Sequence, residues 1–272
     1  MSVQVFMNKT LPALPGKAPA LPPGAFEIGY TAHDGAQHRV PLANAAVVRF
    51  ADTQPTRRIR TRKGQRHLPA RWWSATDGRH IGYKSWLERD QLMWLDWDRA
   101  VTGTASQPFR LRWTTEEGEP RSHVPDYFAE RGGGPPVVVD CRPADRRGPR
   151  DLAAFEATRR ACGLVGWEYR LVGAPDPIAT ANLRWLSGYR HPRYGVPPMA
   201  AVLRAAFAAP VPLMDGAEAA GDPVAVLPVL YHLLGRQELA ADLSVPVHPA
   251  TSVELAARRA GRRGRCCARG TG

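Results

Sequence analysis

The apolar pattern between residues 84 and 172 changes from helical to strand-like and back again, and this order constrains the fold more than any other feature of the chain. Residues 84–98 have apolar side chains at helical spacing, with Ser85 in the N-cap position. Three short strand-like runs follow at 107–113, 123–130 and 136–142. A second amphipathic helix at 149–162 then precedes a fourth strand at 167–172. This order predicts an α/β core, in which a three-stranded meander is the simplest arrangement of the first three strands.

The first of these helices is expected to be buried on most of its surface. Leu87, Trp94 and Leu95 fall on one stripe, and Trp86 falls with Met93 on the adjacent stripe. Such a wide apolar surface predicts a helix that packs against the core sheet.

The segments on either side of the core differ from it in composition. Residues 1–24 are rich in Pro and Ala and predict an extended leader, because proline lacks the backbone donor that helices and sheets need. Residues 25–80 begin with a hairpin around Asp34-Gly35 and continue into a basic arm. We therefore expect the core to occupy residues 81–175, followed by a helical domain at 176–255 and an Arg-rich, disordered tail at 256–272.

Short helices are expected in the C-terminal region at 178–186, 199–207 and 224–234, with a further candidate at 238–243. The last part of this region reads as a helix, a turn at Gly235, a second helix and a short strand. This pattern fits a winged-helix module, and it fits many helical bundles as well.

The charge of the chain points to a polyanionic partner such as DNA or RNA. Lys and Arg number 37 against 25 for Asp and Glu, which gives a formal net charge of +12. The excess of arginine also fits a GC-rich coding sequence, so location is more informative: no residue from 53 to 76 is acidic. This arm is either a phosphate-contacting surface or an ordinary solvated loop. The candidate DNA-binding residues are Arg57, Arg58, Arg60, Arg62, Lys63, Arg66, Arg71, Arg146 and Arg147.

The sequence also excludes several classes of protein. No stretch of about 18 uncharged apolar residues is present, which excludes a membrane-spanning helix. The first twenty residues lack the sustained apolar segment of a secretory signal, so we expect a cytoplasmic, nucleoid-associated protein. The four cysteines lack the paired spacing of a zinc site.

Three acidic residues stand out by their placement. Glu88 lies within the first apolar helix, Asp126 follows Pro125 in a strand-like run, and Asp140 ends the apolar run VVVD. A buried carboxylate costs several kcal/mol unless a cation compensates it. Carboxylates on neighbouring strands, with a third from the helix, could converge on Mg²⁺ or Mn²⁺, which prefer oxygen ligands.

Structural roles for the same acids are the alternative. Glu88 could pair with Arg89 or Lys84 on an exposed helix face. Asp126 could be a turn or edge-strand residue, and Asp140 could cap the following loop or pair with Arg142.

The acid on the first helix, Pro125-Asp126 and the Asp140-Cys141-Arg142 motif together resemble the PD-(D/E)xK nuclease core. That core has the helix, three-strand, helix, strand order. The phrases GYKSWLERD, RSHVPDYF, VVVDCRPADR and ANLRWLSGYRHPRYG are similar to TnsA-like endonuclease subunits of heteromeric transposases, over most of residues 25–250. The resemblance implies a mixed sheet flanked by helices, with a small C-terminal domain.

The resemblance also implies roles for individual residues. Glu88, Asp126 and Asp140 fall on metal-binding positions for Mg²⁺ or Mn²⁺, and Arg142 falls where the family has lysine. Arginine can stabilise the charged phosphorane but cannot activate water, because its pKa is above about 12. Lys84 stands four residues before Glu88, one helical turn away, and could serve the missing role.

The function implied is Mg²⁺-dependent cleavage of one DNA strand at transposon ends. A separate DDE-type transposase would cut the other strand, and the C-terminal domain would bind DNA or an AAA+ ATPase regulator. Two alternatives remain open. The chain could be a catalytically inactive nuclease fold that serves as a DNA-binding or assembly module, which Arg142 favours, or a transcriptional regulator that works through a winged helix.

Overall fold

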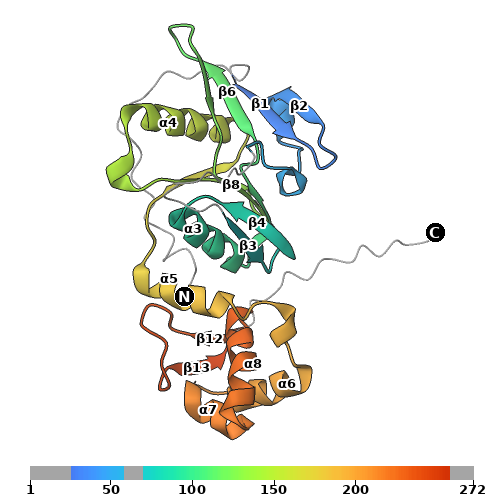
Figure 1. Cartoon of the computed structure of the whole chain (residues 1–272), viewed down its shortest axis with the longest axis vertical. Coiled ribbons are helices and arrows are strands. Elements are labelled where there is room, and N and C mark those ends of the chain that lie inside the picture. The colour runs from blue at the N-terminus through green and yellow to red at the C-terminus, as the bar shows by residue number, and fades with distance from the viewer. Residues whose placement is uncertain (1–25, 58–69, 258–272) are drawn as a thin grey trace, which may run out of the picture. The chain divides into compact units, whose positions relative to one another are not determined.

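A computed structural model of the chain describes residues 26–57 and 70–257 (Figure 1). The chain divides into two compact units, Met1–Ser187 and Gly188–Gly272. The leader, most of the basic arm and the Arg-rich tail lie outside the described residues. Within the described part of the chain, no helix has the length and apolar character needed to cross a membrane.

A four-stranded mixed sheet forms the centre of the first unit. Its order is β10 (Glu168–Val172), β9 (Val137–Cys141), β8 (Tyr127–Arg131) and β5 (Val101–Ser106). β5, β8 and β9 are antiparallel, whereas β10 runs parallel to β9. A parallel neighbour needs a crossover, and helix α4 (Pro149–Leu164) supplies it. With α3 (Trp86–Trp97) in front, the elements follow the expected order of helix, three strands, helix and strand.

The identity of the first core strand differs from the expectation. The run at 107–113 does not join β8 and β9, because its strand β6 (Arg110–Thr114) belongs to a second sheet. β5 takes its place, and its sequence VTGTAS has little apolar character although most of it is buried. Gly103 is needed there, because a Cβ atom would lie 2.9 Å from the Cβ atom of Ala51. The break between the two strands is at Gln107, which has a φ of 50°.

The second sheet joins the N-terminal hairpin to two strands that lie between β5 and β8 in the sequence. Its order is β2 (Gln37–Pro41), β1 (Phe26–Thr31), β6 and β7 (Pro120–His123), all antiparallel. The hairpin expected around Asp34-Gly35 is confirmed. The run expected at 123–130 is divided between β7 and β8, because Pro125 has no N–H group to continue a ladder.

Aromatic side chains from both sheets form one core. The ring of Phe50 lies 5.0 Å from those of Phe109 and Phe128 and 5.7 Å from that of Trp167, measured between centroids. Phe26 of β1 and Ala161 of α4 belong to the same buried cluster. The N-terminal hairpin and the expected core at 81–175 therefore form a single folding unit.

Helix α3 packs against the central sheet, and it also contacts a two-stranded hairpin and a second helix. It is buried from Asp90 to Trp97, as its pattern predicted, but Trp86 at its start is exposed. A two-stranded hairpin of β3 (Ala70–Ser74) and β4 (Arg79–Tyr83) leads into it. Helix α5 (Pro177–Ser187) packs on α3 and belongs to the first unit, although we expected it to open the C-terminal domain. The remaining short helices are α2 (Leu42–Ala45), η2 (Phe50–Asp52), η3 (Ala144–Arg146) and η4 (Pro192–Tyr194).

The second unit has three helices and a small sheet. Helices α6 (Pro197–Ala206), α7 (Leu213–Ala220) and α8 (Pro223–Gly235) are followed by strands β12 (Leu239–Ala241) and β13 (Ser252–Leu255). The sheet order is β11 (Val211–Pro212), β13, β12. The helices expected at 199–207 and 224–234 are confirmed. The helix expected at 238–243 is wrong, because Gln237 has a φ of 57° and redirects the chain into β12.

Candidate active site

Asp126 and Asp140 are brought together by the register of two neighbouring strands. Tyr127 of β8 pairs with Val139 of β9. The residue before Tyr127 and the residue after Val139 therefore lie opposite each other, and these are the two acids. The backbone N–H of Asp126 donates to the Val139 carbonyl at 3.1 Å, and the Cys141 N–H donates to Asp126 Oδ2 at 2.8 Å. The expected convergence of the two acids is present.

The electrostatics of Asp126 indicate that Glu88 joins this pair. Burial raises the pKa of Asp126 well above its usual range, and the charges of Asp140 and then Glu88 raise it further. The same three carboxylates and burial raise the pKa of the Cys141 thiol. All three predicted acids therefore act on one region between the start of α3 and the β8–β9 ladder.

Glu88 also has a structural role at the start of α3. Its Oε2 accepts the backbone N–H of Lys84 at 2.8 Å, and its Oε1 accepts the Ser85 hydroxyl at 3.2 Å. Ser85 Oγ in turn accepts the Glu88 N–H at 3.2 Å, so Ser85 is the N-cap that the sequence predicted. The carboxylate thus satisfies helix-end donors while it faces Asp126.

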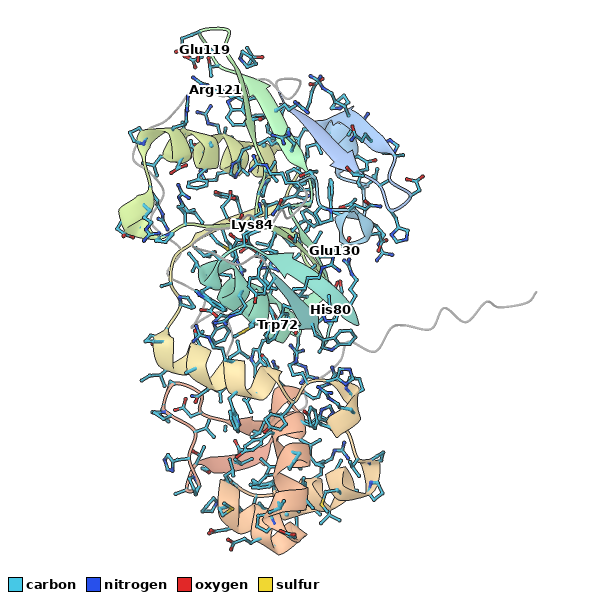
Figure 2. The ribbon with its side chains drawn as sticks, viewed as in Figure 1. Trp72, His80, Lys84, Glu119, Arg121 and Glu130 are labelled. Atoms are coloured by element: carbon cyan, nitrogen blue, oxygen red, sulfur yellow. The ribbon has the colours of Figure 1, made fainter. Side chains whose placement is uncertain are left out.

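Lys84, which Figure 2 labels, lies within electrostatic range of Glu88 and Asp126. Burial lowers the pKa of its ammonium group, and the charges of Glu88 and Asp126 partly restore it. Arg57, the first cation of the basic arm, lowers the same pKa. The structure therefore brings Lys84 to the acids and places Arg57 within electrostatic range of it.

Arg142 is directed elsewhere. Its guanidinium pairs with Asp151 at 2.9 Å, in the first turn of α4, and its Nε donates to the Arg146 carbonyl at 3.1 Å. Strand β9 ends at Cys141, so the alternation that would align Arg142 with Asp140 stops one residue too early. Arg147 donates to the Arg142 carbonyl at 2.7 Å and braces the same loop.

Two further residues hold Asp140, and one of them was not foreseen. His123 Nε2 lies 2.8 Å from Asp140 Oδ1. The Tyr169 hydroxyl donates to Asp140 Oδ2 at 2.9 Å. Burial and the Asp140 charge raise the pKa of Tyr169, so this hydroxyl stays a donor. Tyr169 is in the predicted fourth strand, but its role depends on the parallel pairing of β10 with β9, which the sequence does not show.

The donor set partly fits a divalent cation. Asp126 and Asp140 supply adjacent oxygens. The pKa of Asp126 is raised by burial and then by repulsion from Asp140 and Glu88, and a bound cation would offset both effects. Within residues 26–57 and 70–257, however, no group of three or more His, Cys, Asp or Glu residues is arranged to hold a metal ion. Glu88 accepts a hydrogen bond from the Lys84 N–H, and Asp140 is hydrogen-bonded to His123 and Tyr169. These bonds would have to break before all three acids could bind one ion.

The predicted DNA-binding residues fall into three groups. Arg57 and Arg71 are exposed, as is Arg146, and Arg147 is half-buried. Arg58, Arg60, Arg62, Lys63 and Arg66 lie outside the described residues. Trp72 and Trp73 are half-buried on the β3–β4 hairpin, where the Trp73 ring contacts His80 (Figure 2 labels Trp72 and His80).

No family model matches this chain, and no curated protein has a significantly similar sequence.

Proposed function

We propose that the chain is a Mg²⁺- or Mn²⁺-dependent DNA endonuclease with a PD-(D/E)xK-type core, similar to the TnsA-like subunits of heteromeric transposases. The observation that carries the proposal is the gathering of Asp126, Asp140 and Glu88 beside Lys84. The central sheet and its two helices supply these residues in the order expected for such a core.

The reaction would be hydrolysis of a phosphodiester bond. A bound Mg²⁺ ion would lower the pKa of a coordinated water and neutralise charge on the phosphate. Asp126 and Asp140 would hold the ion, with Glu88 as the third ligand. His123 and Tyr169 would keep the Asp140 carboxylate oriented through their hydrogen bonds. Water would add to phosphorus, the bond to one bridging oxygen would break, and that oxygen would leave as a hydroxyl.

Lys84 is the better candidate for stabilising the charged transition state. Its ammonium lies within electrostatic range of Glu88 and Asp126, whereas the guanidinium of Arg142 is paired with Asp151. A cation that is already in place beside the reacting phosphate stabilises the charge of the transition state, and the protein does not have to rearrange during the reaction. The substitution of the family's lysine by Arg142 is therefore compatible with activity, which weakens the case for an inactive scaffold.

We propose that the second unit is a winged-helix-like domain that binds protein rather than DNA. Helix α8, in the position of the recognition helix, exposes uncharged residues that include Val224 and Ala225. Residues 223–235, which form α8, contain no Lys, Arg, Asp or Glu. A helix that enters the major groove needs cations for the phosphates. The uncharged sequence of α8 opposes the regulator alternative and favours a transposase subunit or an AAA+ ATPase as the partner.

DNA affinity would come from the first unit. Arg57 lies close enough to Lys84 to affect its pKa, so the basic arm begins beside the candidate site. Phosphate contacts of this kind position a protein without reading bases. Recognition of transposon ends would therefore depend on a DDE-type transposase bound to the same DNA.

Nicking of supercoiled plasmid and of transposon-end duplexes tests the proposal. The full chain is assayed with Mg²⁺, with Mn²⁺ and with EDTA, alone and together with the proteins encoded beside it, in parallel with Asp126→Ala. Metal-dependent nicking that Asp126→Ala abolishes supports the enzyme and its site. Metal-independent DNA binding with no nicking under any combination favours the inactive scaffold.

A further inference from the structure

Trp86, the first residue of α3, is unusually exposed for a tryptophan. Its surface is 62% accessible, although the helix is buried from Asp90 onward. Tryptophan is on average highly buried, so an exposed indole is an informative feature of a surface. The Arg89 guanidinium lies over the indole, 4.3 Å from its centroid. This cation–π contact holds the ring in place while leaving much of it accessible to a ligand.

The indole belongs to the same helical turn as one of the three acids. Trp86 lies between Lys84 and Glu88 in the sequence, and its ring is 6.4 Å from that of Tyr83. Two helical residues correspond to about 3 Å along the axis and about 200° around it. Trp86 and Glu88 therefore project to opposite sides of the same turn. A group bound on the indole would not touch the Glu88 carboxylate.

The guanidinium over the ring belongs to a group of two arginines and one carboxylate. Asp90 accepts from Arg89 at 2.8 Å and from Arg184 of α5 at 2.6 Å. Two guanidinium groups on one carboxylate leave a net charge of +1 on this group. An aromatic surface with adjacent cations is complementary to a nucleic-acid strand, whose bases stack and whose phosphates are anionic.

We propose that the indole of Trp86 is a stacking site for an unpaired nucleobase of DNA bound to the first unit. A role for this base in positioning the strand that is cut rests on the endonuclease function proposed above. The stacking itself does not, because it needs only the ring and the flanking cations. Every base has a π-face, so the site would accept any base and would select an unpaired strand over a closed duplex.

A binding comparison in EDTA tests this site without any cleavage. Fluorescence anisotropy measures the affinity of the full chain for three labelled DNAs of one sequence: a blunt duplex, the duplex with a short unpaired tail, and the same tail with abasic sugars. Stacking contributes about 1–3 kcal/mol per base, which corresponds to a change of about 5- to 140-fold in Kd. Trp86→Ala should weaken binding of the tailed duplex by this factor. It should leave the abasic-tailed and blunt duplexes nearly unchanged, and Trp86→Phe should retain most of the affinity.

Trp185→Ala provides the matched control, because Trp185 is 55% exposed on α5 of the same unit. It should not change the ratio of Kd values between the tailed and abasic-tailed DNAs. Circular dichroism of each variant checks that the fold is retained. An equal loss on all three DNAs, or no loss on the tailed duplex, would overturn the proposal. If Trp86→Ala weakens binding of the tailed duplex but not of the abasic-tailed duplex, and the wild type never nicks DNA, only the endonuclease function is refuted.

Discussion

Replacing Ser85 with Ala and Glu88 with Gln separates the two roles that Glu88 can have at the start of α3. Ser85→Ala removes the acceptor of the Glu88 N–H and the donor to Glu88 Oε1. Loss of an N-cap costs about 1 kcal/mol, within a range of about 0.5–2. For a unit of this size that corresponds to a decrease of about 2–4 °C in Tm. The carboxylate remains, so nicking measured well below Tm should stay close to that of the wild type.

Glu88→Gln should have the opposite effect. The amide oxygen can still accept the Lys84 N–H, so the cap is largely kept. Loss of the favourable charge at the helix N-terminus costs about 0.3–1 kcal/mol, and relief of the repulsion with Asp126 offsets part of it. We expect Tm within about 2 °C of the wild type. Nicking should fall by more than about 100-fold, because loss of a direct ligand costs at least as much as loss of an outer-shell partner.

Thermal unfolding by circular dichroism and plasmid nicking in Mg²⁺, on the same preparations, measure both effects. The reasoning is refuted if Glu88→Gln nicks DNA at the wild-type rate, since Glu88 would then be a helix cap only. It is also refuted if Ser85→Ala loses nicking in proportion to stability, because the two roles would then be inseparable.

Two further predictions concern the charges at the site. Burial and the charges of Asp140 and Glu88 raise the pKa of Asp126. In EDTA, where no metal ion is bound, the Asp126 carboxyl does not lower the stability of the fold at pH values below its pKa in the unfolded chain, about 4. Stability is lost as pH rises above that value and through the pKa in the folded chain. Asp126→Asn should raise Tm at pH 8 but not at pH 4 in differential scanning fluorimetry; equal shifts at both pH values would contradict this. Lys84→Ala should reduce Mg²⁺-dependent nicking by at least about tenfold, whereas Arg142→Ala should stay within about threefold, since only Lys84 lies beside the acids. The reverse ranking in a nicking time course would show that Arg142 moves into the site.

The elements that the sequence predicted best are those with a complete local signal. Helix α3 has helical spacing and the Ser85 cap, and β9 is a continuous apolar run bounded by Pro136 and Asp140. β5 was missed because small and hydroxyl residues fill its buried positions, and burial alone does not appear in a hydropathy pattern. The assignment of β6 to another sheet depends on a backbone reversal at Gln107, a residue type that seldom adopts a positive φ.

The candidate site was predicted to a similar extent. The convergence of Asp126 and Asp140 follows from strand alternation and pairing, which are readable from the chain. The direction of Arg142 is not, because it depends on the residue at which β9 ends and on the position of Asp151. The exposure of Trp86 was also missed, because helical periodicity describes a stripe but not how far the core extends beneath the first turn.

The pairing of β1 with β6 has a consequence for the synthesis of the chain. Phe26 is aligned with Trp113, so β1 can form its hairpin with β2 early but cannot pair with β6 until most of the central region has been made. At 5–20 residues per second this delay is on the order of ten seconds. β7, which supplies His123 to Asp140, pairs with the other edge of β6. The Asp140 carboxylate gains its second contact later, because a nascent fragment that ends before β10 lacks Tyr169.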